Sequence, residues 1–183
     1  MKITTIRRLA TLILAAPIAT VVIGAISTPI ASAAPPIQYN HCYANGTTHL
    51  KAKFGSAQCS ADGKGNLAIA SGPNAEAKAV TGTSNKATAS GSYAYAEAGL
   101  GSNNTATATG PVALAVAGIG NNNTATSTGD HATAVAASGD NNTATANVGG
   151  GYADAGYGNN NTATSNGVCS AIAYGDDKNV SCN

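Results

Sequence analysis

The sequence predicts an all-β protein: a two-sheet parallel β-solenoid (β-roll) of six 19-residue coils with a thin, alanine-lined core and disulfide-stapled ends. Three observations lead to this fold. A 19-residue repeat covers residues 63–176, alanines recur within each repeat with a period of two, and four cysteines flank or end the repeat region.

The repeat is visible in a four-residue motif, Asn-Thr-Ala-Thr, whose copies are 19 residues apart. The motif occurs at 104–107, 123–126, 142–145 and 161–164. Extending this frame gives six units that each begin with glycine, at 63–81, 82–100, 101–119, 120–138, 139–157 and 158–176. A fixed period of this length is typical of solenoids, in which each repeat forms one coil.

Small residues alternate within two short runs of every unit, which is the pattern of a strand with one buried face. The sixth position holds Ala68, Ala87, Ala106, Ala125, Ala144 and Ala163. The fifteenth holds Ala77, Ala96, Ala115, Ala134, Ala153 and then Ile172, and the seventeenth holds Ala79, Ala98, Ala117, Ala136, Ala155 and then Tyr174. Gly, Asn, Pro and Asp separate the runs, so each unit reads as strand, turn, strand, turn.

Composition leaves two alternatives for such a chain. It contains one Phe and no Trp, and alanine buries too little apolar surface to build an ordinary globular core. The chain is therefore either disordered or a regular stack held by its backbone hydrogen bonds. Charged residues such as Glu76, Lys78 and Glu97 fall only at positions between the alanines. This phase favours the solenoid, with alanine pointing inward from both strands.

Residues 1–33 have the organisation of a secretory signal peptide. Lys2, Arg7 and Arg8 precede an apolar stretch that ends at the small residues 31–33. A membrane anchor is the alternative, but Pro17 and Pro29 interrupt the stretch. We expect cleavage after residue 33, an N-terminal cap segment at 34–62, the six repeats at 63–176 and a C-terminal cap tail at 177–183. No later stretch is long and apolar enough for a transmembrane helix.

The cysteines predict two disulfide bonds, as is usual for an exported chain. Six coils stacked at ~4.8 Å separate the two ends of the solenoid by ~30 Å, whereas a disulfide needs Cα atoms within about 7 Å. Only the pairs Cys42–Cys59 and Cys169–Cys182 avoid that distance. Each bond would close a loop near an open end of the solenoid.

Several classes of function are disfavoured by the residues present. Without the first 33 residues the chain has six Lys, no Arg and eight acidic residues, so we expect no nucleic-acid binding. His41, Cys42, His49 and Cys59 do not follow a zinc-binding spacing. No acid–base pair, nucleophile motif or phosphate loop is recognisable. We therefore expect no metal site, no cofactor and no enzymatic activity.

The first strand of each central unit presents threonines on its outward face. This predicted Thr face consists of Thr105, Thr107, Thr124, Thr126, Thr143, Thr145, Thr162 and Thr164. Its two interpretations are a solvated face of residues with high β-propensity and a regular lattice that orders water.

The second strand presents apolar side chains outward on adjacent coils. This predicted interaction face consists of Tyr93, Tyr95, Val112, Leu114, Val116, Val135 and Tyr152. Because a contiguous exposed apolar patch usually marks an interface, we expect either self-association into a homo-oligomer or a surface or matrix partner.

The runs Gly91–Ala96 and Gly110–Ala115 resemble the Gly-x-x-Ala-x-Ala repeats of YadA-like trimeric autotransporter adhesin heads. The resemblance covers roughly residues 63–176 and implies a β-roll that associates with copies of itself and binds host matrix. The Thr-x-Thr columns are similar to those of β-solenoid ice-binding proteins, which implies an alternative function through the Thr face. The signal and the Ala-Pro-Pro sequence after it resemble bacterial exports. The expected protein is thus a non-enzymatic, adhesin-like structural or interaction protein that is secreted or bound to the cell envelope.

Overall fold

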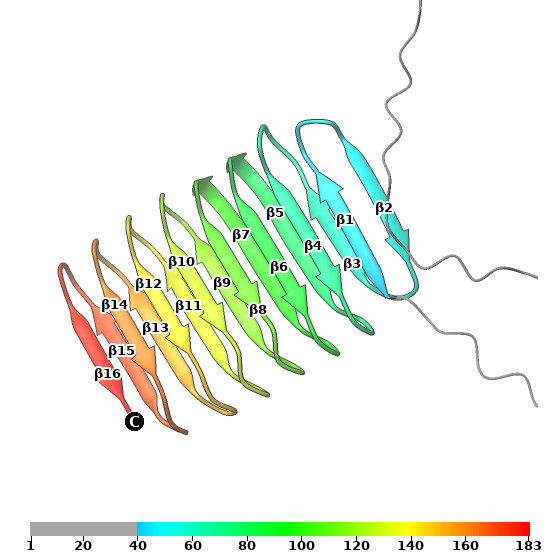
Figure 1. Cartoon of the computed structure of the whole chain (residues 1–183). Helices are drawn as coiled ribbons and strands as arrows, with labels where there is room; N and C mark the ends of the chain where they lie inside the picture. Colours follow the sequence, from blue (N-terminus) through cyan, green and yellow to red (C-terminus); the bar gives the residue numbers. More distant parts are fainter. Residues whose placement is uncertain (1–39) are drawn as a thin grey trace, which may run out of the picture. The chain divides into compact units, whose positions relative to one another are not determined.

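The computed structural model describes residues 40–183, which fold into stacked coils without any helix (Figure 1). The predicted signal peptide at 1–33 lies outside the described residues, as does the first part of the predicted cap, 34–39.

Two sheets form the walls of the solenoid. Sheet A has nine strands: β1 (His41–Asn45), β2 (Leu50–Phe54), β4 (Leu67–Ser71), β6 (Lys86–Ser90), β8 (Thr105–Ala108), β10 (Thr124–Ser127), β12 (Thr143–Ala146), β14 (Thr162–Ser165) and β16 (Asn179–Cys182). Sheet B has seven strands: β3 (Gln58–Ala61), β5 (Glu76–Thr83), β7 (Tyr95–Ser102), β9 (Leu114–Gly118), β11 (Thr133–Ala137), β13 (Tyr152–Gly156) and β15 (Ser170–Tyr174).

The chain alternates between the sheets from β3 onward, and each strand pairs in parallel with the equivalent strand of the next coil. In the central coils the pairing joins residues 19 apart, as in Thr105↔Thr124 and Ala115↔Ala134. The predicted two-sheet β-solenoid with a 19-residue spacing is therefore confirmed.

The core is a double layer of alanine side chains. Alanines of both sheets point inward along the central coils and are fully buried, for example Ala106 and Ala125 in sheet A and Ala115 and Ala134 in sheet B. Only a side chain as small as alanine, or as serine at Ser127, fits the interior when two sheets approach this closely. The predicted direction of the alanine columns is confirmed for these coils.

A buried asparagine ladder runs along one corner, with one asparagine just before each sheet A strand from β4 to β14. Its members are Asn66, Asn85, Asn104, Asn123, Asn142 and Asn161, all with no exposed surface. The Oδ1 atom of Asn104 accepts the backbone N–H of Asn123 at 3.0 Å, and that of Asn123 accepts the N–H of Asn142 at 2.9 Å. The ladder satisfies backbone groups that a dry corner would otherwise leave unpaired.

The glycine that begins each unit completes this corner. The Nδ2 atom of Asn123 donates to the carbonyl of Gly139 at 2.8 Å, one coil further on. Gly120 has a φ of 142°, and a Cβ on it would overlap the carbonyl oxygen of Gly139. Glycine is thus required here both for its backbone conformation and for the close stacking of coils.

The N-terminal end is closed by an antiparallel hairpin. Strand β1 pairs antiparallel with both β2 and β4, so β2 is the outermost strand of sheet A. Cys42 on β1 is bonded to Cys59 on β3, with a Cα–Cα distance of 5.6 Å. This predicted disulfide joins sheet A to sheet B where the stack begins.

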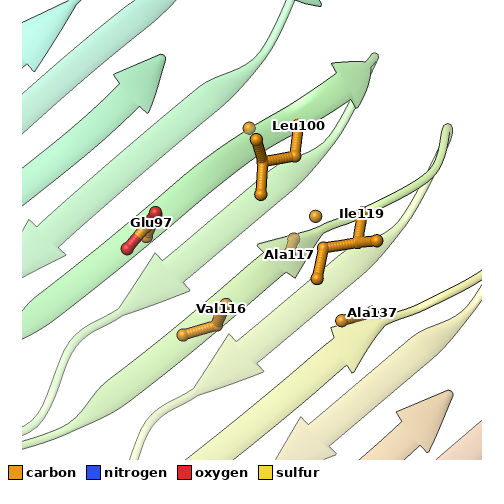
Figure 2. Close-up of a pocket in the computed structure, with 8 residues that line it drawn as sticks. Glu97, Leu100, Val116, Ala117, Ile119 and Ala137 are labelled. Carbon is orange, nitrogen blue, oxygen red and sulfur yellow. The ribbon is translucent and has the colours of Figure 1, made fainter. Parts of the chain in front are cut away.

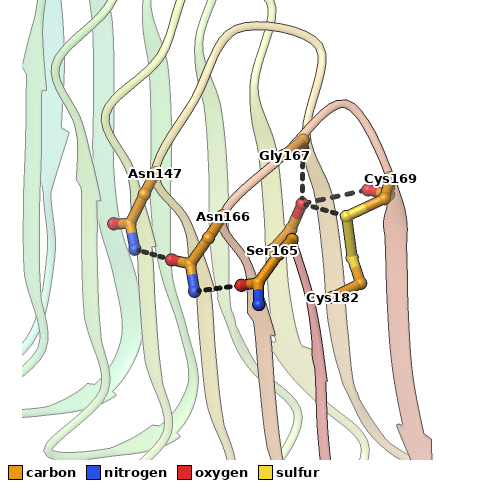
Figure 3. Close-up of a disulfide and its surroundings, with 7 residues drawn as sticks. Asn147, Ser165, Asn166, Gly167, Cys169 and Cys182 are labelled. Carbon is orange, nitrogen blue, oxygen red and sulfur yellow. Dashed lines mark hydrogen bonds between the residues drawn. A yellow bond between two sulfur atoms is a disulfide. The ribbon is translucent and has the colours of Figure 1, made fainter.

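At the C-terminal end, Cys169 beside β15 is bonded to Cys182 on β16, with a Cα–Cα distance of 6.2 Å (Figure 3). The predicted pairing of all four cysteines is therefore confirmed. Ser165 lies beside this bond and its hydroxyl donates to the carbonyls of Gly167 and Cys169, both at 3.0 Å.

The last coil departs from the 19-residue phase. Ala153 pairs with Ala171 and Ala155 pairs with Ala173, so the turn after β14 is one residue shorter than in earlier coils. The 19-residue frame assigns Ile172 and Tyr174 to the alanine columns, but the shortening places Ala171 and Ala173 there and moves Ile172 and Tyr174 to the outer face. They are 45% and 43% exposed.

Candidate interaction faces

The outer face of sheet B carries five of the seven residues predicted for the interaction face. Tyr95, Leu114 and Tyr152 lie in one column across the sheet, and Val116 and Val135 lie in the neighbouring column. All five are partly exposed. Parallel register places Leu114 and Val116 directly beside Thr133 and Val135, which gives the middle of sheet B an apolar surface.

The other two predicted members, Tyr93 and Val112, lie in the turns that precede β7 and β9. Their φ angles are 57° and 53°, so both have left-handed backbone conformations. Tyr93 is 62% exposed and Val112 is 44% exposed. The alternation that predicted a continuous strand does not distinguish its first residues from the turn before it.

A second row of apolar side chains was not predicted and borders the same face. Leu100, in the last part of β7, and Ile119, directly after β9, occupy equivalent positions of neighbouring coils and are 55% and 56% exposed. Figure 2 shows them side by side on neighbouring coils. Together with Glu97, Val116 and Ala137 they surround a depression of about 190 Å³ that is floored by glycines. An aliphatic or aromatic side chain of a partner would fit a depression of this size and lining.

Leu100 and its equivalent in the next coil hold a backbone conformation that costs free energy. Leu100 and Ile119 have φ angles of 54° and 55°, where a β-branched residue such as Ile is strongly disfavoured relative to Asn or Gly. The equivalent residue of the following coil, Ser138, shows that a polar residue is compatible with the same turn. The apolar choice at these positions is therefore not required by the fold.

Charged groups border the apolar centre toward the N-terminal end. Lys78 forms an ion pair with Glu76 at 2.7 Å and its ammonium nitrogen lies 5.1 Å from the ring centre of Tyr95. The hydrogen bond to Glu76 raises the pKa of Lys78, and burial opposes that effect. Burial, followed by the hydrogen bond that its hydroxyl donates to Glu97, raises the pKa of Tyr95.

A tyrosine–aspartate cluster borders the face toward the C-terminal end. Asp154 accepts hydrogen bonds from the hydroxyls of Tyr152 at 3.0 Å and Tyr174 at 2.6 Å. The hydrogen bond to Asp154 and then burial raise the pKa of Tyr174 well above its usual value. For Tyr152, burial contributes most to a raised pKa, followed by the hydrogen bond to Asp154. Tyr157 packs edge-on against Tyr174 with ring centres 4.9 Å apart.

The outer face of sheet A carries the predicted Thr face. Thr105, Thr124, Thr143 and Thr162 align in one column and Thr107, Thr126, Thr145 and Thr164 in another, across β8, β10, β12 and β14. All eight are partly exposed. The result is a regular grid with spacings of ~6.7 Å along the strands and ~4.8 Å between them.

A third exposed surface, at the N-terminal end of sheet A, was missed by sequence reasoning. Leu50 and Phe54 on β2 are 57% and 65% exposed, and Tyr43 on β1 is 37% exposed. Tyr43 and Phe54 line a depression of about 180 Å³ with Ile69 of β4. Alternation within 50–54 would have predicted a strand, but nothing in it indicates that the strand lies at the sheet edge.

Within residues 40–183, no group of three or more His, Cys, Asp and Glu side chains could hold a metal ion. The same residues contain no apolar helix of membrane-spanning length. Both disulfides indicate folding in an extracellular or otherwise oxidising environment.

Comparison of the chain with protein-family models, with curated proteins and with solved structures gives no match in any of the three.

Proposed function

We propose that this chain is a non-enzymatic structural or interaction protein, secreted or attached to the cell envelope, that associates through the outer face of sheet B. The favoured contact is with further copies of the chain, and a surface or matrix partner, as for an adhesin head, is the alternative. The observation that carries the proposal is the apolar centre formed by Leu114, Val116 and Val135 together with the neighbouring Leu100 and Ile119.

Two physical arguments support this assignment. Contiguous apolar surface on a soluble protein is costly to leave in water and commonly marks an interface. In addition, Leu100 and Ile119 keep large apolar side chains at a left-handed position that Ser138 fills with a polar one, so the backbone conformation does not account for the apolar residues.

The polar groups at either end of the apolar centre fit an interface with a hydrated rim. Glu76 and Lys78 neutralise each other on one side. On the other, the Asp154 carboxylate is hydrogen-bonded by two tyrosines. A flat partner could therefore cover the centre while Glu76, Lys78 and Asp154 keep these partners at its rim.

The test is the oligomeric state of the disulfide-bonded protein, measured by light scattering over a range that reaches high micromolar concentration. We expect the unaltered chain to associate and the double variant Leu114→Asp/Val135→Asp to remain monomeric. The matched control, Thr107→Asp/Thr126→Asp, places the same charges on sheet A and should associate like the unaltered chain. Two results together would contradict the proposal: the unaltered chain is monomeric, and the sheet B variant changes neither its mass nor its binding to glycans or matrix.

A second candidate function, ice binding through the Thr face, is favoured by the in-register pairing of threonines across four strands. Its spacing repeats in two dimensions, as contact with an ordered layer of water requires. Ice crystals grown in the presence of the folded protein should then show altered shape or arrested growth. Thr126→Tyr should abolish the effect, and normal crystal growth with the unaltered protein would exclude this function.

A further inference from the structure

We propose that the free edge of β2 is a second binding site, which takes an extended peptide segment with acidic residues at alternate positions. The site adjoins Glu76 and Lys78 at the charged end of the outer face of sheet B and does not include the apolar centre of that face. It combines three properties of the hairpin at the N-terminal end: a strand edge without a partner strand among residues 40–183, an apolar outer face and two lysines on the inner face.

The edge is unpaired because β2 lies at the end of sheet A and, among residues 40–183, pairs only with β1. The hydrogen bonds of β1 show which residues of β2 bond to β1 and which do not. The N–H of Gly46 donates to Asn66 and the carbonyl of Asn40 accepts from Gly72, so even-numbered β1 residues bond to β4. Odd-numbered residues therefore bond to β2.

This alternation determines which backbone N–H and C=O groups of β2 point toward its free edge. Tyr43, opposite Ala52, belongs to the set that bonds to β2. The backbone groups of Ala52 therefore point toward β1, and those of Lys51 and Lys53 point to the free edge. An added strand would bond to the N–H and C=O groups of these two lysines.

The lysine side chains lie on the inner face of β2. Lys51 and Lys53 stand opposite Ala44 and Cys42, whose side chains are buried between the sheets. In the described part of the chain, the first strand of sheet B is β3, which lies beneath β1, so no sheet B strand of residues 40–183 lies beneath β2. Both lysines are exposed and line a depression of about 120 Å³ that also includes Lys78 and Glu76.

The positive charges of Lys51 and Lys53 favour an acidic segment as the partner of this edge. A second copy paired about a two-fold axis at Ala52 would place Lys51 opposite its partner's Lys53, and like charges directly opposite each other are destabilising. Burial in lipid would leave the backbone groups of the edge without partners, at high cost. A segment with carboxylates at alternate positions places them opposite both lysines and its apolar residues beside Leu50, Ala52 and Phe54.

The charge distribution of the whole solenoid would favour approach of an acidic segment to this end. Residues 40–91 contain five lysines and two acidic residues, whereas residues 92–183 contain one lysine and six acidic residues.

The experiment uses the disulfide-bonded protein and a capped, fluorescein-labelled peptide of sequence Val-Glu-Val-Glu-Val, followed by fluorescence anisotropy. We expect saturable binding, weaker binding of Val-Val-Glu-Glu-Val, whose carboxylates fall on both faces of a strand, and none of Val-Lys-Val-Lys-Val. Amide hydrogen exchange should show new protection at Lys51 and Lys53, because their N–H groups would bond to the peptide.

Charge reversal supplies the decisive comparison. Lys51→Glu/Lys53→Glu should weaken binding of the Glu peptide by about tenfold or more and create binding of the Lys peptide. Lys64→Glu/Lys86→Glu makes the same change in net charge away from the edge and should alter affinity by about twofold at most at physiological salt.

Equal effects of the two charge reversals would overturn the proposal, as would peptide binding without protection at Lys51 and Lys53. Failure to bind the Glu peptide, whether or not the protein binds phosphatidylglycerol vesicles, would also overturn it. The association tested with Leu114→Asp/Val135→Asp involves the other sheet, so either proposal can fail while the other stands.

Discussion

Sheets A and B are built on the same alanine interior, yet their outer faces differ in regularity. Across β8, β10, β12 and β14, sheet A repeats threonine at both outward positions. The equivalent positions of sheet B change from Glu76 and Lys78 through Leu114 and Val116 to Tyr152 and Asp154. Because the repeat occupies each structural position several times, it provides an internal comparison of what the fold requires.

Positions that the fold requires are the same in every central coil, as with the buried alanines and the asparagine ladder. The variable positions of sheet B are not fixed by packing inside the solenoid. Their change from charged through apolar to aromatic residues is consequently the feature that the fold alone does not explain, and it is the reason why we propose association through sheet B.

The largest effect is expected in the interior that both sheets share. Asn123→Ala should lower the free energy of unfolding by roughly 4 kcal/mol, because it leaves the N–H of Asn142 and the carbonyl of Gly139 buried without partners. The measurement is chemical denaturation with the disulfides intact.

The neighbouring Asn122, exposed with a φ of 57°, provides the control. Asn122→Gly should change the free energy of unfolding by about 0.5 kcal/mol or less. Equal losses in both variants would show that the ladder contributes no more than the turn itself.

A smaller effect of opposite sign is expected where sheet B meets its apolar turns. Ile119→Asn should raise the free energy of unfolding by about 1 kcal/mol, because Asn tolerates the left-handed conformation that Ile holds at φ 55°. The same variant should weaken association in light scattering.

Ser138→Asn, at the equivalent position one coil later, is the matched control and should leave association unchanged. If Ile119→Asn gains stability without losing association, the apolar turn residues have no part in the interface, and the comparison between the sheets would rest on Leu114, Val116 and Val135 alone.

The smallest effect concerns alkaline pH at the C-terminal end of sheet B. Folding raises the pKa values of Tyr152 and Tyr174 above the ordinary value of 10.0. The resulting stabilisation is complete below pH 10.0 and is lost as the pH rises above it toward the folded-state values. In Asp154→Asn the phenolate absorbance should therefore appear at lower pH than in the unaltered chain.

Asp140 lies in a turn and accepts hydrogen bonds from Asn121, so Asp140→Asn should leave the tyrosine titration unchanged. The same titration curve for all three proteins would mean that Asp154 does not control the tyrosines of this cluster.

Sequence reasoning succeeded where a physical requirement repeats. The alanine columns predicted the inward faces because only small side chains fit between the sheets. The distance between the ends allowed just one pairing of Cys42, Cys59, Cys169 and Cys182. The asparagine ladder had an equally regular signal, one Asn every 19 residues before the first strand of each unit. It was interpreted as a turn former because asparagine in a turn is ordinarily exposed.

By itself, the sequence determined the period, the inward faces and the disulfide pairing, since each depends on spacing along the chain. Tertiary structure decided what depends on neighbours: the antiparallel hairpin that leaves β2 at an edge, the left-handed turns that hold Tyr93 and Val112, and the shortened last coil that turns Ile172 and Tyr174 outward. A period specifies which residues are equivalent. The three-dimensional stacking of the coils determines at which residues the repeat no longer holds. At the two ends of the described stack, a strand has a neighbour on one side only, so its register is less constrained.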